Sequence, residues 1–217
     1  MYKVAHWRAV ALICGLSTAV AVWATPLAHL DHHSLTGHMI QHLLLMTISA
    51  PLIVLGVSPL TLARWLPNLV LCWLAGTACV IFWHIPVIFE FAMRSEWCHQ
   101  VEKATFLAAG ILFWWPVLRE WRPNGGRPLQ WPIALYLFLA TLPCDALSAF
   151  LTFCGRVVYG MYSCGVVPSA ASALRDQERA GSLMWTWVTF AYLVPAVVIA
   201  MRTLSGQPRC PQLRHSQ

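Results

Sequence analysis

Six apolar stretches dominate this sequence and limit what it can fold into. They lie at about 9–24, 39–57, 66–83, 104–118, 132–153 and 181–201. A helix needs about 20 predominantly apolar residues to cross the hydrocarbon core of a bilayer. Lipid offers no hydrogen bonds to an exposed backbone, so a chain of this kind spans the membrane as helices. We therefore expect an all-α integral membrane bundle of about six transmembrane helices, with residues 1–217 forming a single polytopic domain.

The composition agrees with a chain dissolved in lipid. Of the 217 residues, 59% are hydrophobic and only 10% are charged, whereas a soluble domain carries roughly 25% charged residues. The 12 tryptophans suit the membrane–water interfaces, where this residue is enriched. The net charge of +6 comes from Lys and Arg scattered through the loops, without a basic stripe. We therefore expect the lipid bilayer as a partner and no nucleic acid.

The motifs of the common soluble enzymes are missing from the sequence. It contains no Walker loop, no GxGxxG segment after a strand, no GxSxG and no HExxH. Hydrolase or kinase chemistry thus has no residues to rest on, and we expect a protein that is not an enzyme.

The distribution of Lys and Arg indicates the orientation. Cytoplasmic loops carry an excess of these residues, and the loop at 25–37 has none, which favours an outside location. Six spans then leave both termini in the cytoplasm. The first stretch has a second interpretation, because Lys3 and Arg8 followed by apolar residues also resemble a signal peptide. Residues 1–24 are therefore either a span or a cleaved signal.

Polar residues gather at the outer ends of the expected helices. His38, His42 and Met46 are spaced i, i+4, i+8 and share one face of the second helix. The remaining residues of this kind stand where the third helix ends and the fourth and sixth begin, namely His84, His99, Glu102, Asp176 and Met184. Because successive spans run in opposite directions, all of these positions meet the same face of the membrane.

These residue types suit copper. Imidazole and thioether groups are good copper ligands, and two histidines at i, i+4 can hold one metal ion. We predict that His38, His42, His84 and His99 are metal ligands. Glu102 and Asp176 would orient imidazoles by accepting hydrogen bonds from them. Met46 and Met184 are possible ligands, with core packing as the competing interpretation.

A further group of histidines lies in the loop before the second helix. His29, His32 and His33 flank Asp31 there. They either capture metal loosely before it moves inward or belong to an ordinary solvated loop.

Several segments resemble a known family. The run His38-Met39-Ile40-Gln41-His42-Leu43-Leu44-Leu45-Met46, followed by Ala50-Pro51-Leu52 and Leu55-Gly56, is similar to the hallmark segment of the polytopic CtaG-type cytochrome c oxidase assembly factors. Further similar segments follow in order: Trp83-His84-Ile85-Pro86, His99 and Glu102 with Ala109-Gly110, Phe113-Trp114-Trp115-Pro116, Asp176-Gln177, Ala180-Gly181 and Met184-Trp185. The resemblance covers roughly residues 8–200.

The resemblance implies a function and a location. It implies a multi-pass protein of the bacterial inner (plasma) membrane that acts as a chaperone in the respiratory chain. Such a protein contacts cytochrome c oxidase subunits and assists copper delivery to the haem–copper oxidase. The alternatives are a copper or proton transporter, a haem-binding membrane protein and a structural scaffold for oxidase subunits.

Two features of the sequence depart from the family. The family typically has a second histidine directly after the acid of the fourth-helix motif, where this chain has Lys103. An ammonium there opposes cation binding unless it reaches outward or pairs with Glu102. The family also commonly has seven spans, and from the six apolar stretches we expect the first of the seven to have no counterpart here.

Overall fold

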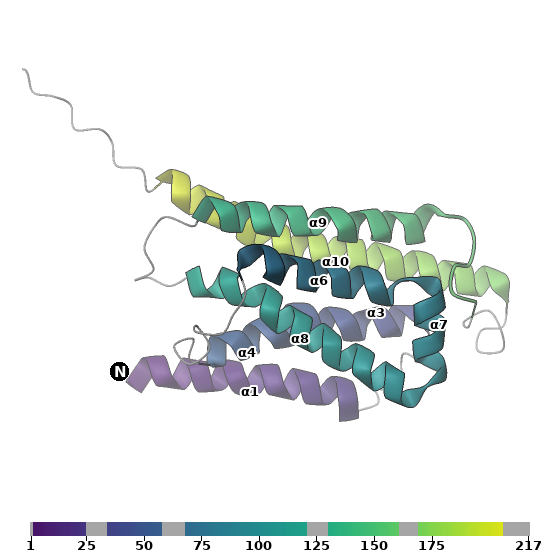
Figure 1. Ribbon diagram of the computed structural model, residues 1–217, viewed down its shortest axis with the longest axis horizontal. Helices are drawn as coiled ribbons and strands as arrows, with labels where there is room; N and C mark the ends of the chain where they lie inside the picture. Colours follow the sequence, from purple (N-terminus) through teal and green to yellow (C-terminus); the bar gives the residue numbers. More distant parts are fainter. Residues whose placement is uncertain (1, 25–33, 58–67, 121–129, 161–168, 206–217) are drawn as a thin grey trace, which may run out of the picture.

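The protein is a bundle of long helices (Figure 1). The computed structural model describes residues 2–24, 34–57, 68–120, 130–160 and 169–205. Within these ranges there is no strand. Five helices are long and apolar enough to cross a membrane, and a sixth span results if one bent pair of helices is counted as one. The expected all-α membrane bundle of about six spans is confirmed.

Successive spans run in alternating directions through the bundle (Figure 1). The helices are α1 (Tyr2–Ala24), α3 (Leu35–Leu43), η2 (Leu44–Ser49), α4 (Ala50–Gly56), α6 (Leu69–Trp83), α7 (Pro86–Arg94), α8 (Glu96–Glu120), α9 (Gln130–Phe153) and α10 (Ala170–Ser205). The most extensive helix–helix contacts join α9 to α10, α1 to α4 and α6 to α8. This alternation brings the start of α3, the end of α6 and the start of α8 to one end of the bundle.

The second span is one continuous helix that changes from α-helical to π-helical hydrogen bonding and back. It runs from α3 through the π-helix η2 into α4, with Pro51 in the first turn of α4. In a π-helix the carbonyl of Met46 would accept from the amide five residues later, which is Pro51 and has no N–H. The indole of Trp114 on α8 donates to this carbonyl instead, at 2.9 Å. The π-helix and Trp114 thus accommodate a proline inside the span.

The third span is short and bent. Helix α6 contains only 15 residues, and α7 departs from it at 75°. Pro86 occupies the first turn of α7, where its missing N–H costs nothing. His84 and Ile85 therefore form the corner between the two helices.

Two helices begin eight or more residues before the apolar stretches indicate. The fourth starts at Glu96 rather than at 104, and the sixth starts at Ala170 rather than at 181. Charged residues lie in these added segments, such as Glu96 and Lys103 on α8 and Arg175 and Asp176 on α10, so hydropathy does not mark them. The polar residues on the inner face of α8 are nevertheless fully covered by neighbouring helices.

One glycine sets the distance between the second span and α8. A Cβ at Gly110 would lie 2.8 Å from the Cβ of Ala50 and 3.0 Å from the Cα of Met46. Any larger residue would push the helices apart. Gly110 therefore allows α8 to approach η2 and the start of α4 closely.

Candidate metal centre

The first two residues of the candidate centre lie one turn apart on α3. The hydroxyl of Ser34 accepts from the Gly37 amide and caps this helix. The next turns place His38 and His42 on the buried face, with 1% and 4% of their surfaces exposed. Their Nε2 atoms are 2.6 Å apart. The predicted i, i+4 pair thus converges on one point.

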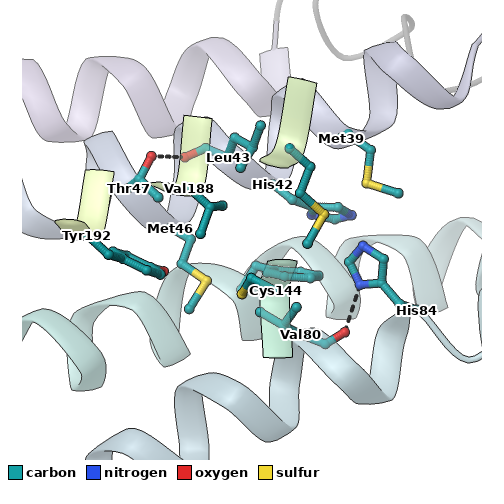
Figure 2. Close-up of a pocket in the computed structure, with 12 residues that line it drawn as sticks. Met39, His42, Leu43, Met46, Thr47, Val80, His84, Cys144, Val188 and Tyr192 are labelled. Atoms are coloured by element: carbon teal, nitrogen blue, oxygen red, sulfur yellow. Dashed lines mark hydrogen bonds between the residues drawn. The ribbon is translucent and has the colours of Figure 1, made fainter. Parts of the chain in front are cut away.

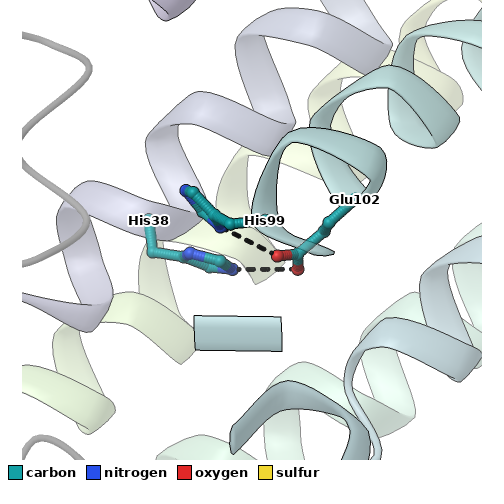
Figure 3. A group of neighbouring side chains, drawn as sticks. All are labelled: His38, His99 and Glu102. Atoms are coloured by element: carbon teal, nitrogen blue, oxygen red, sulfur yellow. Dashed lines mark hydrogen bonds and ion pairs between the residues drawn. The ribbon is translucent and has the colours of Figure 1, made fainter. Parts of the chain in front are cut away.

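Helix α8 brings a carboxylate and a third imidazole to the same point (Figure 3). The Oε1 atom of Glu102 lies 3.3 Å from Nε2 of His38 and 3.1 Å from Nε2 of His42. Its Oε2 atom lies 3.1 Å from Nδ1 of His99. We call these four residues the histidine–glutamate cluster. Ligand atoms of His38, His99 and Glu102 all lie within 4.8 Å of one another.

The cluster needs a positive charge to be stable. Glu102 is completely buried, and a buried carboxylate is costly unless a charge or hydrogen-bond donors compensate it. Two imidazole nitrogens only 2.6 Å apart also repel unless a proton or a metal ion lies between them. A cation coordinated by His38, His42 and Glu102 would satisfy both requirements.

Aromatic rings enclose the cluster. Phe106 stacks on His42 with ring centroids 3.9 Å apart, and Phe89 meets His38 edge-on at 4.9 Å. Both phenylalanines are almost fully buried. Water is thereby kept from the imidazoles, which strengthens any interaction with a cation.

His84 lies beside the cluster rather than within it. Its ring centroid is 6.5 Å from that of Phe106, whose ring also stacks on His42. The Nδ1 atom lies 2.7 Å from the carbonyl oxygen of Val80, whereas Nε2 is buried without a hydrogen-bond partner. The hydroxyl of Tyr159 donates to the His84 carbonyl at 3.0 Å and holds the corner in place.

Lys103 is buried, as is Glu102 beside it in the sequence. Its exposed fraction is 2%, so the side chain does not reach outward to water. It lies one turn after His99 on the inner face of α8. The outward orientation that would have kept its charge away from a metal site is therefore wrong.

The other predicted residues take separate places. Asp176 accepts from the Leu35 amide at 2.6 Å and from the Thr36 hydroxyl at 2.7 Å, so its carboxylate contacts the start of α3. Met46 and Met184 line a small cavity together with His42 and His84. His29, His32 and His33 lie outside the described residues. The assignment of metal ligands remains a prediction.

Three residues near the centre were not predicted from the sequence as site residues. Met39 and Cys144 line the same cavity, and Tyr159 fixes the corner at His84. The spacing of Met39 from Met46, i to i+7, places both on one helix face and was the available signal. Nothing in the sequence connects Cys144 or Tyr159 to the centre.

The family of the chain follows from comparison with known proteins. The family model described as Cytochrome c oxidase caa3 assembly factor (Caa3_CtaG) matches residues 2–205. The chain belongs to this family. The resemblance to this family is thereby confirmed, and the histidine–glutamate cluster lies within the matched residues of this caa3 assembly factor family member.

Curated relatives of this family member are mycobacterial. The uncharacterized protein Mb0105 of Mycobacterium bovis and the uncharacterized protein MT0111 of Mycobacterium tuberculosis are each 28% identical over 196 residues, covering 76% of this chain and 29% of the relative. The uncharacterized protein ML1998 of Mycobacterium leprae is 25% identical over 202 residues, covering 79% of this chain and 30% of the relative. The chain thus spans less than a third of their length. No solved structure matches it.

Proposed function

We propose that this protein binds copper at the histidine–glutamate cluster and assists its delivery to a cytochrome c oxidase during assembly. Family membership supports the link to the oxidase. The observation that carries the copper step is the meeting of His38 Nε2, His42 Nε2 and Glu102 Oε1 within 3.3 Å in a buried position. The protein would act without catalysing a reaction, as a metal-binding chaperone.

The donor set explains why copper suits the cluster. Imidazole nitrogens bind copper well, and affinity for divalent metals peaks at copper in the Irving–Williams order. His99 contacts the second oxygen of Glu102 and would fix the orientation of the carboxylate. The imidazoles of His38 and His42 and the carboxylate of Glu102 would hold a copper ion that must later leave for the oxidase.

The location of the cluster suits transfer to a partner. The cluster lies in the first turns of α3 and α8, near one end of the bundle. We place this end at the outer face of the bacterial plasma membrane, with both termini in the cytoplasm, because the loop at 25–37 lacks Lys and Arg. Copper would then be released to oxidase subunits on that side.

The adjoining space favours an ion over a haem. The cavity beside the cluster measures about 30 Å³, whereas pockets for organic ligands measure roughly 300–1,000 Å³. Phe89 and Phe106 fill the remaining space around the imidazoles. A Soret band in the purified protein would contradict this assignment and favour the haem alternative.

Metal analysis of the purified protein tests the proposal. We expect the wild type to hold a stoichiometric amount of Cu(II) at the cluster and the His38→Ala, His42→Ala double variant to lose this Cu(II). His6→Ala is the control, because His6 is an exposed histidine on α1. In cells lacking the protein, the wild type and the control should restore oxidase activity and the double variant should not. Equal copper in the wild type and the double variant would refute the ligand assignment. Restored oxidase in that variant would favour a scaffold.

A further inference from the structure

A small cavity lies directly against the histidine–glutamate cluster and has an unusual lining. Its volume is about 30 Å³, enough for one ion or one water molecule. Three thioethers, a thiol and two imidazoles contribute to its wall, from Met39, Met46, Met184, Cys144, His42 and His84. Figure 2 shows the labelled members of this set gathered around one space. We call it the sulfur cavity.

The sulfur groups come from three spans. Met39 and Met46 share one face of the second span, at i and i+7, with His42 between them at i+3. Cys144 comes from α9 and Met184 from α10. All four sulfur residues are buried. Packing alone does not require three thioethers and a thiol at one point, because leucine or valine fills such a space as well.

His84 lines this cavity and has an unused ring nitrogen. Its Nδ1 atom lies against the Val80 carbonyl, which fixes Nδ1 as the protonated nitrogen and leaves a lone pair on Nε2. Nε2 is buried and has no hydrogen-bond partner, while only 7% of the residue is exposed. Figure 2 shows this nitrogen on the side of the ring away from Val80. A buried acceptor without a partner is costly, and a bound cation would remove that cost.

The residues that line the cavity determine which kind of cation it can bind. Thioether and thiolate ligands select soft metal ions, above all monovalent copper, whereas carboxylates suit harder ions. No carboxylate is among the residues that line the sulfur cavity.

We infer that the sulfur cavity is a second metal site, which binds a cuprous ion through Met39, Met46, Met184 and His84. His42 belongs both to this cavity and to the histidine–glutamate cluster, where its Nε2 lies 2.6 Å from that of His38. An ion can therefore pass between the two sites without leaving the protein. The inference goes beyond the proposed function but rests on it for the source of the copper.

X-ray absorption at the copper edge tests the second site. The protein is loaded with Cu(I) without oxygen, and competition with a chromogenic Cu(I) chelator gives the affinity. We expect sulfur scattering from the wild type. In the Met39→Leu, Met46→Leu, Met184→Leu triple variant, sulfur scattering should vanish and affinity fall by about 10- to 100-fold. Leucine conserves the volume of methionine. Met93→Leu is the control, since Met93 is buried on α7 outside the cavity.

A second variant separates this inference from the proposed function. The His38→Ala, Glu102→Gln variant disables the cluster and keeps every sulfur cavity residue, so it should retain the sulfur scattering. Sulfur scattering that persists in the triple variant overturns the second site. Copper bound through nitrogen and oxygen alone in the wild type also overturns it but leaves the proposed function intact. A wild type without copper refutes both. If the triple variant does not fold, the three single variants replace it, and unchanged affinity in all three overturns the inference.

Discussion

The Nε2 atoms of His38 and His42 lie 2.6 Å apart in the interior of the bundle. Such a distance brings two lone pairs together unless a proton or a metal ion intervenes. Glu102 Oε1 lies within 3.3 Å of both nitrogens and supplies the negative charge that would hold a cation there. The charge of Glu102 and the packing of α8 against α3 therefore control the centre.

Removing the charge of Glu102 should weaken copper binding without unfolding the protein. Glu102→Gln keeps the shape of the side chain but neutralises the carboxylate that contacts three imidazoles. We expect copper affinity to fall by about 10- to 100-fold, measured by chelator competition. Glu90→Gln is the control, because Glu90 is a partly exposed carboxylate on α7. Equal losses in both variants would mean that the effect is not specific to the cluster.

Lys103 should limit the affinity for divalent copper. Replacing it by histidine removes a buried positive charge next to Glu102 and supplies the residue that the family typically has there. We expect Lys103→His to bind Cu(II) about tenfold more tightly, equivalent to about 1.4 kcal/mol. Isothermal titration of the purified variant measures this change. Arg94→His serves as the control, since the Arg94 side chain is 79% exposed, and a weaker Cu(II) affinity in Lys103→His would contradict the prediction.

The end of the bundle that carries the centre could be predicted from the sequence. Alternation of the spans brings the start of the second, the end of the third and the start of the fourth together, whatever the details of packing. Helical spacing also placed His38 and His42 on one face. These conclusions need only helix direction and the 3.6-residue repeat, and both follow from the apolar pattern.

The contacts within the centre could not be predicted in the same way. They depend on how far each helix is rotated about its axis, which packing decides. His84 contacts Phe106 and the Val80 carbonyl, whereas His38, His42 and His99 all contact Glu102, so the four predicted histidines do not form one group. The π-helix after Leu43 and the corner at His84 also shift the register of the side chains. Hydropathy carries no information on such local features.

Asp176 should support the fold more than it supports metal binding. Its carboxylate accepts from the Leu35 amide and the Thr36 hydroxyl and so caps α3 from α10. Asp176→Asn should lower the free energy of unfolding by about 1–2 kcal/mol, because capping bonds weaken. Thermal unfolding in detergent measures this loss. Copper stoichiometry should stay unchanged, and its loss in Asp176→Asn but not in the control Glu178→Gln would give Asp176 a direct role at the centre.

Gly110 should couple helix packing to copper binding. Its missing Cβ allows α8 to lie against Ala50 and Met46, and a methyl group there would be only 2.8 Å from the Ala50 side chain. Gly110→Ala should therefore push α8 outward and carry His99 and Glu102 away from α3. We expect a loss of about 1–3 kcal/mol in stability from this overpacking, together with weaker copper binding. Ala108→Val adds bulk at an exposed position of the same helix and should change neither property. If Gly110→Ala kept its full copper affinity, the close approach of the two helices would not be what positions Glu102.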